Sequence, residues 1–247
     1  LPMNTPDTLY VSGDGGHAPP FRSWGDAATN IAAALFSAGP GALIVVSNGT
    51  YQTHVELAMS NDVSIVSLSG AAETIVDGGF PGRTNRCFSM TAGNSVLEGF
   101  TITGGAGYEW PCNLGGGVGM TDGGTVRNCI ICGNTAKYGG GLKARGLVEN
   151  CVISNNYTWE SVGGGIHSSE DALIRYCLIS DNYSLKSGGG VFILEGTVRE
   201  SVISNNYADD AGGGIYISAG GMIEQCHIVE NMKIGRASCR ERVCHRV

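Results

Sequence analysis

The chain has 247 residues, of which 40 are glycine, and a formal net charge of −7. Only 7 prolines accompany the glycines, which excludes collagen, and 42% hydrophobic with 15% charged residues excludes a disordered chain. So much glycine would weaken every helix of a coiled coil or bundle, and the acidic balance provides no basic surface for nucleic acid. The composition predicts a β-rich protein in which the glycines occupy particular positions.

The N-terminal part predicts a lead-in and one helix. Residues 1–22 are assigned to a strand or loop, and residues 23–38 to an amphipathic helix that starts with the capping pair Ser23 and Asp26. Its apolar face would be formed by Trp24, Ala28, Ile31 and Leu35. Strands are expected near 42–46, 63–68, 74–77 and 96–102, with a turn at 48–51. Because the open sheet edge of a solenoid invites aggregation, the helix is expected to cap the N-terminal end.

From residue 115 the sequence repeats. Gly-Gly-Gly begins at 115, 139, 163, 188 and 212, at intervals of 24, 24, 25 and 24 residues. The units also share a V/I-x-x-C-x-I-x-x-N pattern, which ends at Asn134, Asn156, Asn182, Asn206 and Asn231. This period is too short for a propeller blade and lacks the leucine frame of leucine-rich repeats, but it fits one coil of a parallel β-helix. Residues 115–232 are therefore predicted as regular coils of a single β-helix domain, 23–232.

Equivalent residues in successive coils would lie about 4.8 Å apart and form columns inside the solenoid. The asparagines are expected to form a hydrogen-bonded ladder, and the triple glycines to supply positive φ and close backbone approach at the opposite corner. A column of small buried thiols is predicted from Cys129, Cys151, Cys177 and Cys226, with Ser201 substituting once. A zinc site is not predicted. Cys129 and Cys132 form the one C-x-x-C pair of the sequence, and strand alternation points their side chains to opposite faces.

The last residues depart from the repeat. Residues 233–247 contain five of the 15 Lys and Arg residues and two of the nine cysteines. The run at 234–243, IGRASCRERV, resembles the translated read-through of a short-read sequencing adapter, so 233–247 is interpreted as a non-native tail of a metagenomic fragment. The alternative is a basic tail for nucleic acid or anionic lipid. The coil that ends at Asn231 is expected to expose a sheet edge and to self-associate.

The residues after the predicted helix carry a family resemblance. The segment 39–51, GPGALIVVSNGTY, is similar to the opening of the pectate-lyase-like right-handed parallel β-helix superfamily. The V-x-x-C-x-I-x-x-N and GGG units resemble the repeats of large bacterial surface proteins, including polymorphic outer-membrane-protein-like sequences. The resemblance covers about residues 9–232 and implies an all-β, right-handed parallel β-helix. Because this fold hosts lyases, hydrolases, epimerases, adhesins and phage tailspikes, it leaves the function open.

Candidate site residues lie mainly between each repeat asparagine and the next triple glycine. A glycan groove is predicted from Tyr108, Trp110, Tyr138, Tyr157, Trp159, Tyr183, Lys186, Tyr207 and Asp209. Counting four residues past each asparagine places Tyr138, Glu160, Lys186 and Asp210 in one column. One interpretation is a charge ladder in which Lys186 lies between two carboxylates. The other is a catalytic pair, Glu160 and Asp210, about 10 Å apart and near the upper limit for an inverting glycosidase.

Other catalytic patterns of the superfamily are missing from the sequence. Of the polygalacturonase-like set N-T-D, D-D, G-H-G and R-I-K, only Asp209-Asp210 is represented, and neither the D-P-H motif of mannuronan epimerases nor the aspartate cluster of pectate lyases is visible. No metal ligand or cofactor is predicted, with calcium left open. His167 and His227 are expected to be surface residues at outward strand positions.

The favoured function is an extracellular or cell-surface bacterial module that binds polysaccharide or presents to it. The alternatives are a polysaccharide lyase or glycoside hydrolase of the same superfamily, and a purely structural stalk or adhesin segment. A glycan is the expected partner, nucleic acid is not, and no run of about 18 apolar residues predicts membrane insertion. Convergent carboxylates with a basic residue on one face would favour the enzyme.

Overall fold

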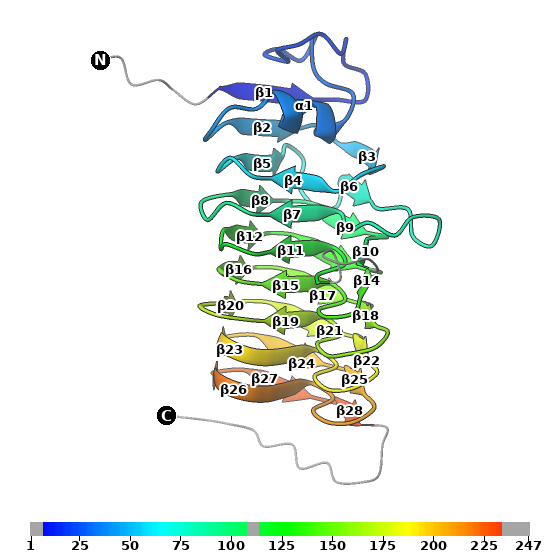
Figure 1. Cartoon of the computed structure of the whole chain (residues 1–247), viewed down its shortest axis with the longest axis vertical. Helices are drawn as coiled ribbons and strands as arrows, with labels where there is room; N and C mark the ends of the chain where they lie inside the picture. The colour runs from blue at the N-terminus through cyan, green and yellow to red at the C-terminus, as the bar shows by residue number, and fades with distance from the viewer. Residues whose placement is uncertain (1–6, 108–113, 234–247) are drawn as a thin grey trace, which may run out of the picture.

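The chain winds into an elongated parallel β-solenoid (Figure 1), described in a computed structural model for residues 7–107 and 114–233. Each strand pairs in parallel with the equivalent strands of neighbouring coils. Within the described residues there is one helix, α1 (Ile31–Ser37), near the N-terminal end. The predicted all-β parallel solenoid is confirmed.

The largest sheet consists of two rows of strands that join at β23 (Val191–Arg199), which pairs along its length with β26 (Ile215–Glu224). The first row contains β4 (Leu57–Met59), β7 (Phe88–Met90), β11 (Val118–Met120), β15 (Leu142–Ala144) and β19 (Ile166–Ser168). The second row contains β1 (Thr8–Val11), β2 (Leu43–Val46), β5 (Ser64–Ser67), β8 (Val96–Glu98), β12 (Thr125–Arg127), β16 (Leu147–Glu149) and β20 (Leu173–Arg175).

Two further sheets complete each coil. The eight-stranded sheet contains β3 (Gly49–Gln52), β6 (Thr74–Asp77), β9 (Thr101–Thr103), β13 (Ile130–Cys132), β17 (Val152–Ser154), β21 (Leu178–Ser180), β24 (Val202–Ser204) and β27 (His227–Val229). The six-stranded sheet has the shortest strands: β10 (Ala106–Gly107), β14 (Thr135–Ala136), β18 (Tyr157–Thr158), β22 (Tyr183–Ser184), β25 (Tyr207–Ala208) and β28 (Met232–Lys233). A regular coil therefore runs through four strands, for example β15 to β18.

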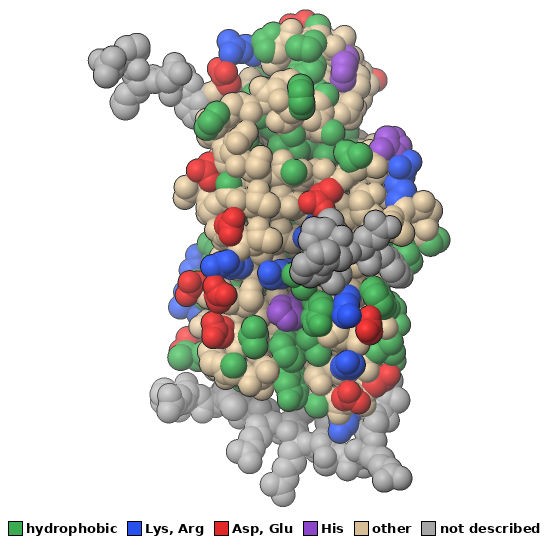
Figure 2. Space-filling view, in the orientation of Figure 1, with side chains coloured by type: hydrophobic (Ala, Val, Ile, Leu, Met, Phe, Trp, Pro, Cys, Tyr) green, Lys and Arg blue, Asp and Glu red, His purple; other side chains and the backbone are tan. Residues whose placement is uncertain are grey.

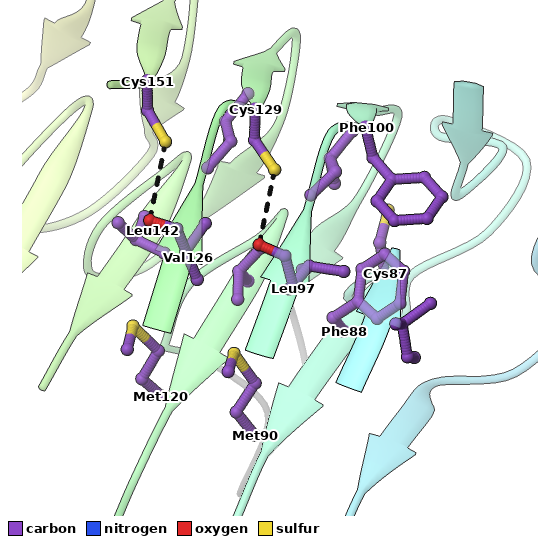
Figure 3. Close-up of a cluster of buried hydrophobic side chains, with 14 of the residues drawn as sticks. Cys87, Phe88, Met90, Leu97, Phe100, Met120, Val126, Cys129, Leu142 and Cys151 are labelled. Carbon is purple, nitrogen blue, oxygen red and sulfur yellow. Dashed lines mark hydrogen bonds between the residues drawn. The ribbon is translucent and has the colours of Figure 1, made fainter. Parts of the chain in front are cut away.

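Alternation along the strands fills the interior with apolar side chains. In β13, Ile131 is buried while Ile130 and Cys132 are half-buried on the outer side. Larger side chains fill the N-terminal coils, where the rings of Phe88 and Phe100 lie 6.3 Å apart (Figure 3). In-register stacking thus converts the repeat into a continuous core.

The predicted thiol column is present in this core. Cys129, Cys151, Cys177 and Cys226 are buried and unbridged. Their thiols donate weak hydrogen bonds to backbone carbonyls, for example from Cys129 Sγ to Leu97 O at 3.8 Å (Figure 3). Ser201 fills the missing position, where its Oγ donates to Arg199 O at 2.8 Å and accepts from Cys177 N at 3.1 Å. The column serves packing.

The asparagine ladder forms as predicted. In Asn182, Nδ2 donates to Asn206 Oδ1 at 3.0 Å and to Ile153 O at 2.9 Å. Its Oδ1 accepts from both the backbone N and Nδ2 of Asn156, each at 3.0 Å. The five ladder residues are Asn134, Asn156, Asn182, Asn206 and Asn231. Every polar atom of a buried amide is thereby satisfied by the coil above, the coil below or the turn itself.

The triple glycines have the predicted positive φ but not the predicted place. The first glycine of each triple has a φ between 59° and 73°. The third packs directly against the asparagine ladder: a Cβ on Gly165 would lie 2.9 Å from Asn182 Nδ2 and 2.7 Å from Gly190 O. The expectation that the glycines form the opposite corner is therefore wrong. They remove side chains where the coil passes over the asparagine amides.

The predicted helix over 23–38 is too long. The structure contains only Ile31–Ser37, with Asn30 Oδ1 accepting from Ala33 N at 2.8 Å as the N-cap. Before it, Tyr10 N donates to Phe21 O at 2.8 Å and Ala28 N donates to Tyr10 O at 2.9 Å. The backbone at Phe21 and Ala28 therefore bonds to β1, and the helix does not extend back over residues 21–28. The Ser23 and Asp26 side chains do bond to each other at 2.7 Å, but within an isolated turn.

The turn predicted at 48–51 is also wrong, since strand β3 begins at Gly49 and pairs with β6. Tyr51 is buried in this strand, and its hydroxyl bonds to the carbonyl of Ser47 at 3.1 Å. The Asn-Gly pair marks the bend into a strand here.

Candidate functional site

The predicted column of Tyr138, Glu160, Lys186 and Asp210 does not form. The turns between ladder asparagine and first glycine differ in length, so counting from the asparagine loses the register. Lys186 and Asp210 are neighbours, with Asp210 N donating to Lys186 O at 2.8 Å, whereas Tyr138 is bridged to Leu114 in the preceding coil. Tyr138 faces β19, where its ring lies 5.7 Å from that of His167.

The charges of this turn also pair differently from the prediction. Glu160 Oε2 lies 3.2 Å from Lys137 Nζ, and Lys186 forms no ion pair within 4.0 Å among the described residues. Charges do alternate in a column, but on the outer side of the second row, where Glu98 pairs with Arg127 and Glu149 with Arg175, each at 2.7 Å. The predicted charge ladder is therefore wrong at Lys186.

Several predicted binding residues are brought together on the six-stranded sheet. Tyr157, Tyr183 and Tyr207 form its outward column in register, and the first two rings stack at 5.6 Å. Tyr183 Oη donates to Asp209 Oδ1 at 2.8 Å, and this bond to a carboxylate raises the pKa of Tyr183 to about 12. Trp159 lies half-buried in the turn after Tyr157. Tyr108 and Trp110 lie outside the described residues.

A second aromatic column lies on the outer side of the first row. His167, Phe192 and Tyr216 are paired in register, with ring centroids 5.3 Å apart between the first two and 5.5 Å between the last two. Tyr138 adds its edge to His167. We call Tyr138, His167, Phe192 and Tyr216 the aromatic strip. Figure 2 shows this side of the molecule, where hydrophobic side chains and a histidine run between charged side chains on both flanks.

The same outward column continues into Lys143, which pairs in register with His167, and then into Gly119, which pairs in register with Lys143. His167 is half-buried. Burial is the main cause that lowers the pKa of its imidazole to about 4, and the positive charge of Lys143 is the second cause. The histidine is thus uncharged at neutral pH, in contrast to the solvated surface residue expected from the sequence. His227, by comparison, is exposed.

A buried arginine lies beyond the N-terminal end of the aromatic strip, next to Gly119. Arg86 is 5% exposed, its Nε lies 3.0 Å from Glu56 Oε2, and its Nη1 donates to Leu114 O at 2.9 Å. Its guanidinium occupies the space in front of Gly119, where a Cβ would collide with Nη1. No sequence pattern predicts a role for this residue, because it precedes the regular repeats.

A surface pocket of about 180 Å³ lies away from the aromatic strip, between the start of α1 and the segment 51–57. Its walls are largely apolar and include Ile31 and Leu57. Across residues 7–107 and 114–233 no three His, Cys, Asp or Glu side chains are placed to hold a metal ion. In that same part of the chain, no helix is long and apolar enough to cross a membrane.

The aromatic strip has a sequence signal. The fifth position of each unit that begins with Gly-Gly-Gly is Gly119, Lys143, His167, Phe192 and Tyr216 in turn. Because this position follows a buried residue in a strand, alternation alone directs it outward. Counting from the glycines, which lie close to the strand, keeps the register that counting from the asparagines loses.

The comparisons with known proteins agree with the fold. A family model described as "Right handed beta helix region" matches residues 64–232. No curated protein matches the sequence.

Among solved structures, pectin methylesterase PemA from Erwinia chrysanthemi superposes with a TM-score of 0.52 at 12% identity, over 81% of this chain and 66% of that one. A pectin methylesterase in complex with a hexasaccharide gives 0.52 at 13% identity, over 87% and 66%. Escherichia coli ybhc gives 0.56 at 14% identity, over 93% and 86%. This chain therefore spans just under two thirds of the first two, and likeness at such identities concerns the fold.

Proposed function

Since this chain belongs to the right-handed β-helix family, we propose that it is a bacterial extracellular or cell-surface module that binds polysaccharide along the aromatic strip. The observation that carries the proposal is the in-register column of His167, Phe192 and Tyr216, flanked by Tyr138. A linear glycan is itself a repeating polymer, and a strip that runs along the solenoid axis offers it contacts from successive coils. Pectin and a hexasaccharide in the names of structural neighbours support a glycan as the ligand class.

The chemistry of the strip suits a neutral sugar surface. Aromatic rings and a neutral imidazole combine apolar edges with a few hydrogen-bonding groups, which is the mixture that ligand sites use. Stacking within the column fixes the rings, so little side-chain entropy is lost when a ligand binds. Tyr216, 36% exposed, offers the most accessible ring of the column.

The test compares two aromatic columns of the same protein. Glycan-array screening identifies a ligand, and calorimetric titration then compares the wild type with Phe192→Ala and with Tyr207→Ala, whose ring lies in the column of the six-stranded sheet. We expect Phe192→Ala to weaken binding at least about tenfold and Tyr207→Ala to leave it within about twofold. Circular dichroism checks that both variants keep the fold.

The opposite pattern, with loss only in Tyr207→Ala, would move the site to Tyr157, Tyr183 and Tyr207. An array without any bound glycan overturns the proposal and leaves the structural stalk or adhesin segment. The enzymatic alternative, a lyase or glycoside hydrolase with Glu160 and Asp210, requires a cleaved glycan product that Glu160→Gln and Asp210→Asn both abolish.

A further inference from the structure

Two basic side chains lie together at the N-terminal end of the aromatic strip. The guanidinium of Arg86 is held in front of Gly119 by its ion pair with Glu56 and its hydrogen bond to Leu114 O. Gly119 pairs in register with Lys143. The guanidinium and the Lys143 ammonium therefore occupy neighbouring places in one outward column.

The carboxylates near Arg86 and Lys143 form ion pairs with arginines. Glu56 pairs with Arg86, while Asp122 and Glu170 lie 3.9 Å and 2.8 Å from the guanidinium of Arg145. In the described part of the chain, Lys143 has no carboxylate within 4.0 Å of its Nζ. Burial, and then the charges of Arg145 and Arg86, lower the pKa of Lys143. A half-buried ammonium with cationic neighbours gains stability from any anion that reaches it.

His167 lies on the other side of Lys143, paired with it in register. Its Nδ1 is buried and makes no hydrogen bond to any described residue. As a neutral imidazole, the ring can offer a ligand a hydrogen bond without adding charge. The imidazole and the two basic side chains are therefore neighbours on the outer side of the first row, and the ring has a nitrogen that makes no hydrogen bond within the described residues.

We propose that Arg86, Lys143 and His167 form an oxyanion site on the surface that takes one carboxylate or sulfate ester group of the glycan bound on the aromatic strip. Lys143 contacts the anion, His167 donates a hydrogen bond to it, and the fixed guanidinium of Arg86 adds a positive field from beneath. The oxyanion site thus selects acidic glycans. This selectivity rests on the proposed function, and it sets the register of the polymer by placing one charged group at one end of the strip.

The test uses three hexasaccharides with one glucan backbone: neutral, oxidised to the uronate, and sulfated. We expect the wild type to bind at least one charged form about tenfold more tightly than the neutral form, with a preference that shrinks as NaCl rises from about 0.05 to 0.3 M. Lys143→Gln should bind all three alike. The matched control Lys186→Gln, an exposed lysine in the turn before the next glycine triple, should keep the preference. Whichever charged form binds more tightly identifies carboxylate or sulfate as the group.

A second measurement does not need a glycan. Acetic anhydride labels accessible lysines, and inorganic sulfate should slow labelling of Lys143 while leaving Lys186 unchanged in the same sample, as read by mass spectrometry. Protection without glycan binding supports the oxyanion site and overturns the proposed function. Neutral-glycan binding that depends on Phe192, with no charge preference and no protection, supports the function and overturns the oxyanion site. A Lys143→Gln variant that retains the charge preference also overturns it.

Discussion

At the scale of single residues, burial decides more than residue type. His167 and His227 are both outward residues of strands, yet only His167 is enclosed between Tyr138, Phe192 and Lys143. Because the imidazole is enclosed, the folded protein favours its neutral form over its protonated form. Proton uptake at this one ring therefore opposes folding.

The expected consequence is a pH-dependent loss of stability. The pKa of His167 falls from 6.5 to about 4 on folding, so its contribution is complete above pH 6.5 and is lost as the pH falls towards 4. The stability difference between wild type and His167→Gln should therefore shrink by about 3 kcal/mol between pH 7.5 and 4. Urea unfolding at a series of pH values measures it, with the exposed His227→Gln as the control that keeps the wild-type slope. Parallel curves for wild type and His167→Gln would contradict the assignment.

At the scale of an element, the asparagine ladder acts as one unit that crosses every regular coil. Each amide bonds to its neighbours above and below, so the loss of one side chain breaks bonds in three coils. The third glycines pack so closely on the amides that a Cβ at their positions would collide with the ladder. The ladder is expected to be among the least substitutable parts of the fold.

Asn182→Ala should lower the free energy of unfolding by about 3 to 5 kcal/mol. It leaves Asn156 N and Ile153 O without their buried partners, and each such loss costs about 1 to 3 kcal/mol. Asn155→Gly, at an exposed position with a φ of 54° that glycine adopts freely, is the matched control and should change stability by less than about 1 kcal/mol. Equal thermal midpoints for the two variants would show that the ladder contributes little.

At the scale of the whole molecule, the repeat determines the fold. Removal of residues 234–247 should leave the far-ultraviolet circular dichroism unchanged and the thermal midpoint within about 2 °C, because the pairing of β25 with β28 and the bonds from Asn206 to Asn231 both lie before residue 234. The interpretation of 233–247 as a non-native tail makes the same prediction. A drop of about 10 °C would mean that the tail belongs to the fold.

The regular coils could be predicted because each of their positions is fixed by its own coil and the next. Buried thiols, asparagines and outward Phe192 all follow from alternation and period. The predicted helix was wrong before Ile31 because Ala28 bridges to Val11 and donates to Tyr10 O, contacts that no local pattern contains. Tyr138 was misplaced because turn length, rather than composition, sets its register. Arg86 lay beyond sequence reasoning because its partners Glu56 and Leu114 belong to other coils.

The direction of the asparagine ladder bears on how such a chain can change its length. Along the ladder Oδ1 accepts from the preceding coil, and from Asn134 to Asn206 each Nδ2 donates to the following coil, so the facing edges of successive coils are complementary. A duplicated unit of about 24 residues would meet matching donors and acceptors on both sides, wherever in the regular region it was inserted. Gain or loss of whole coils therefore leaves no amide unmatched, and the number of coils can vary in descent while the cross-section of the solenoid stays the same.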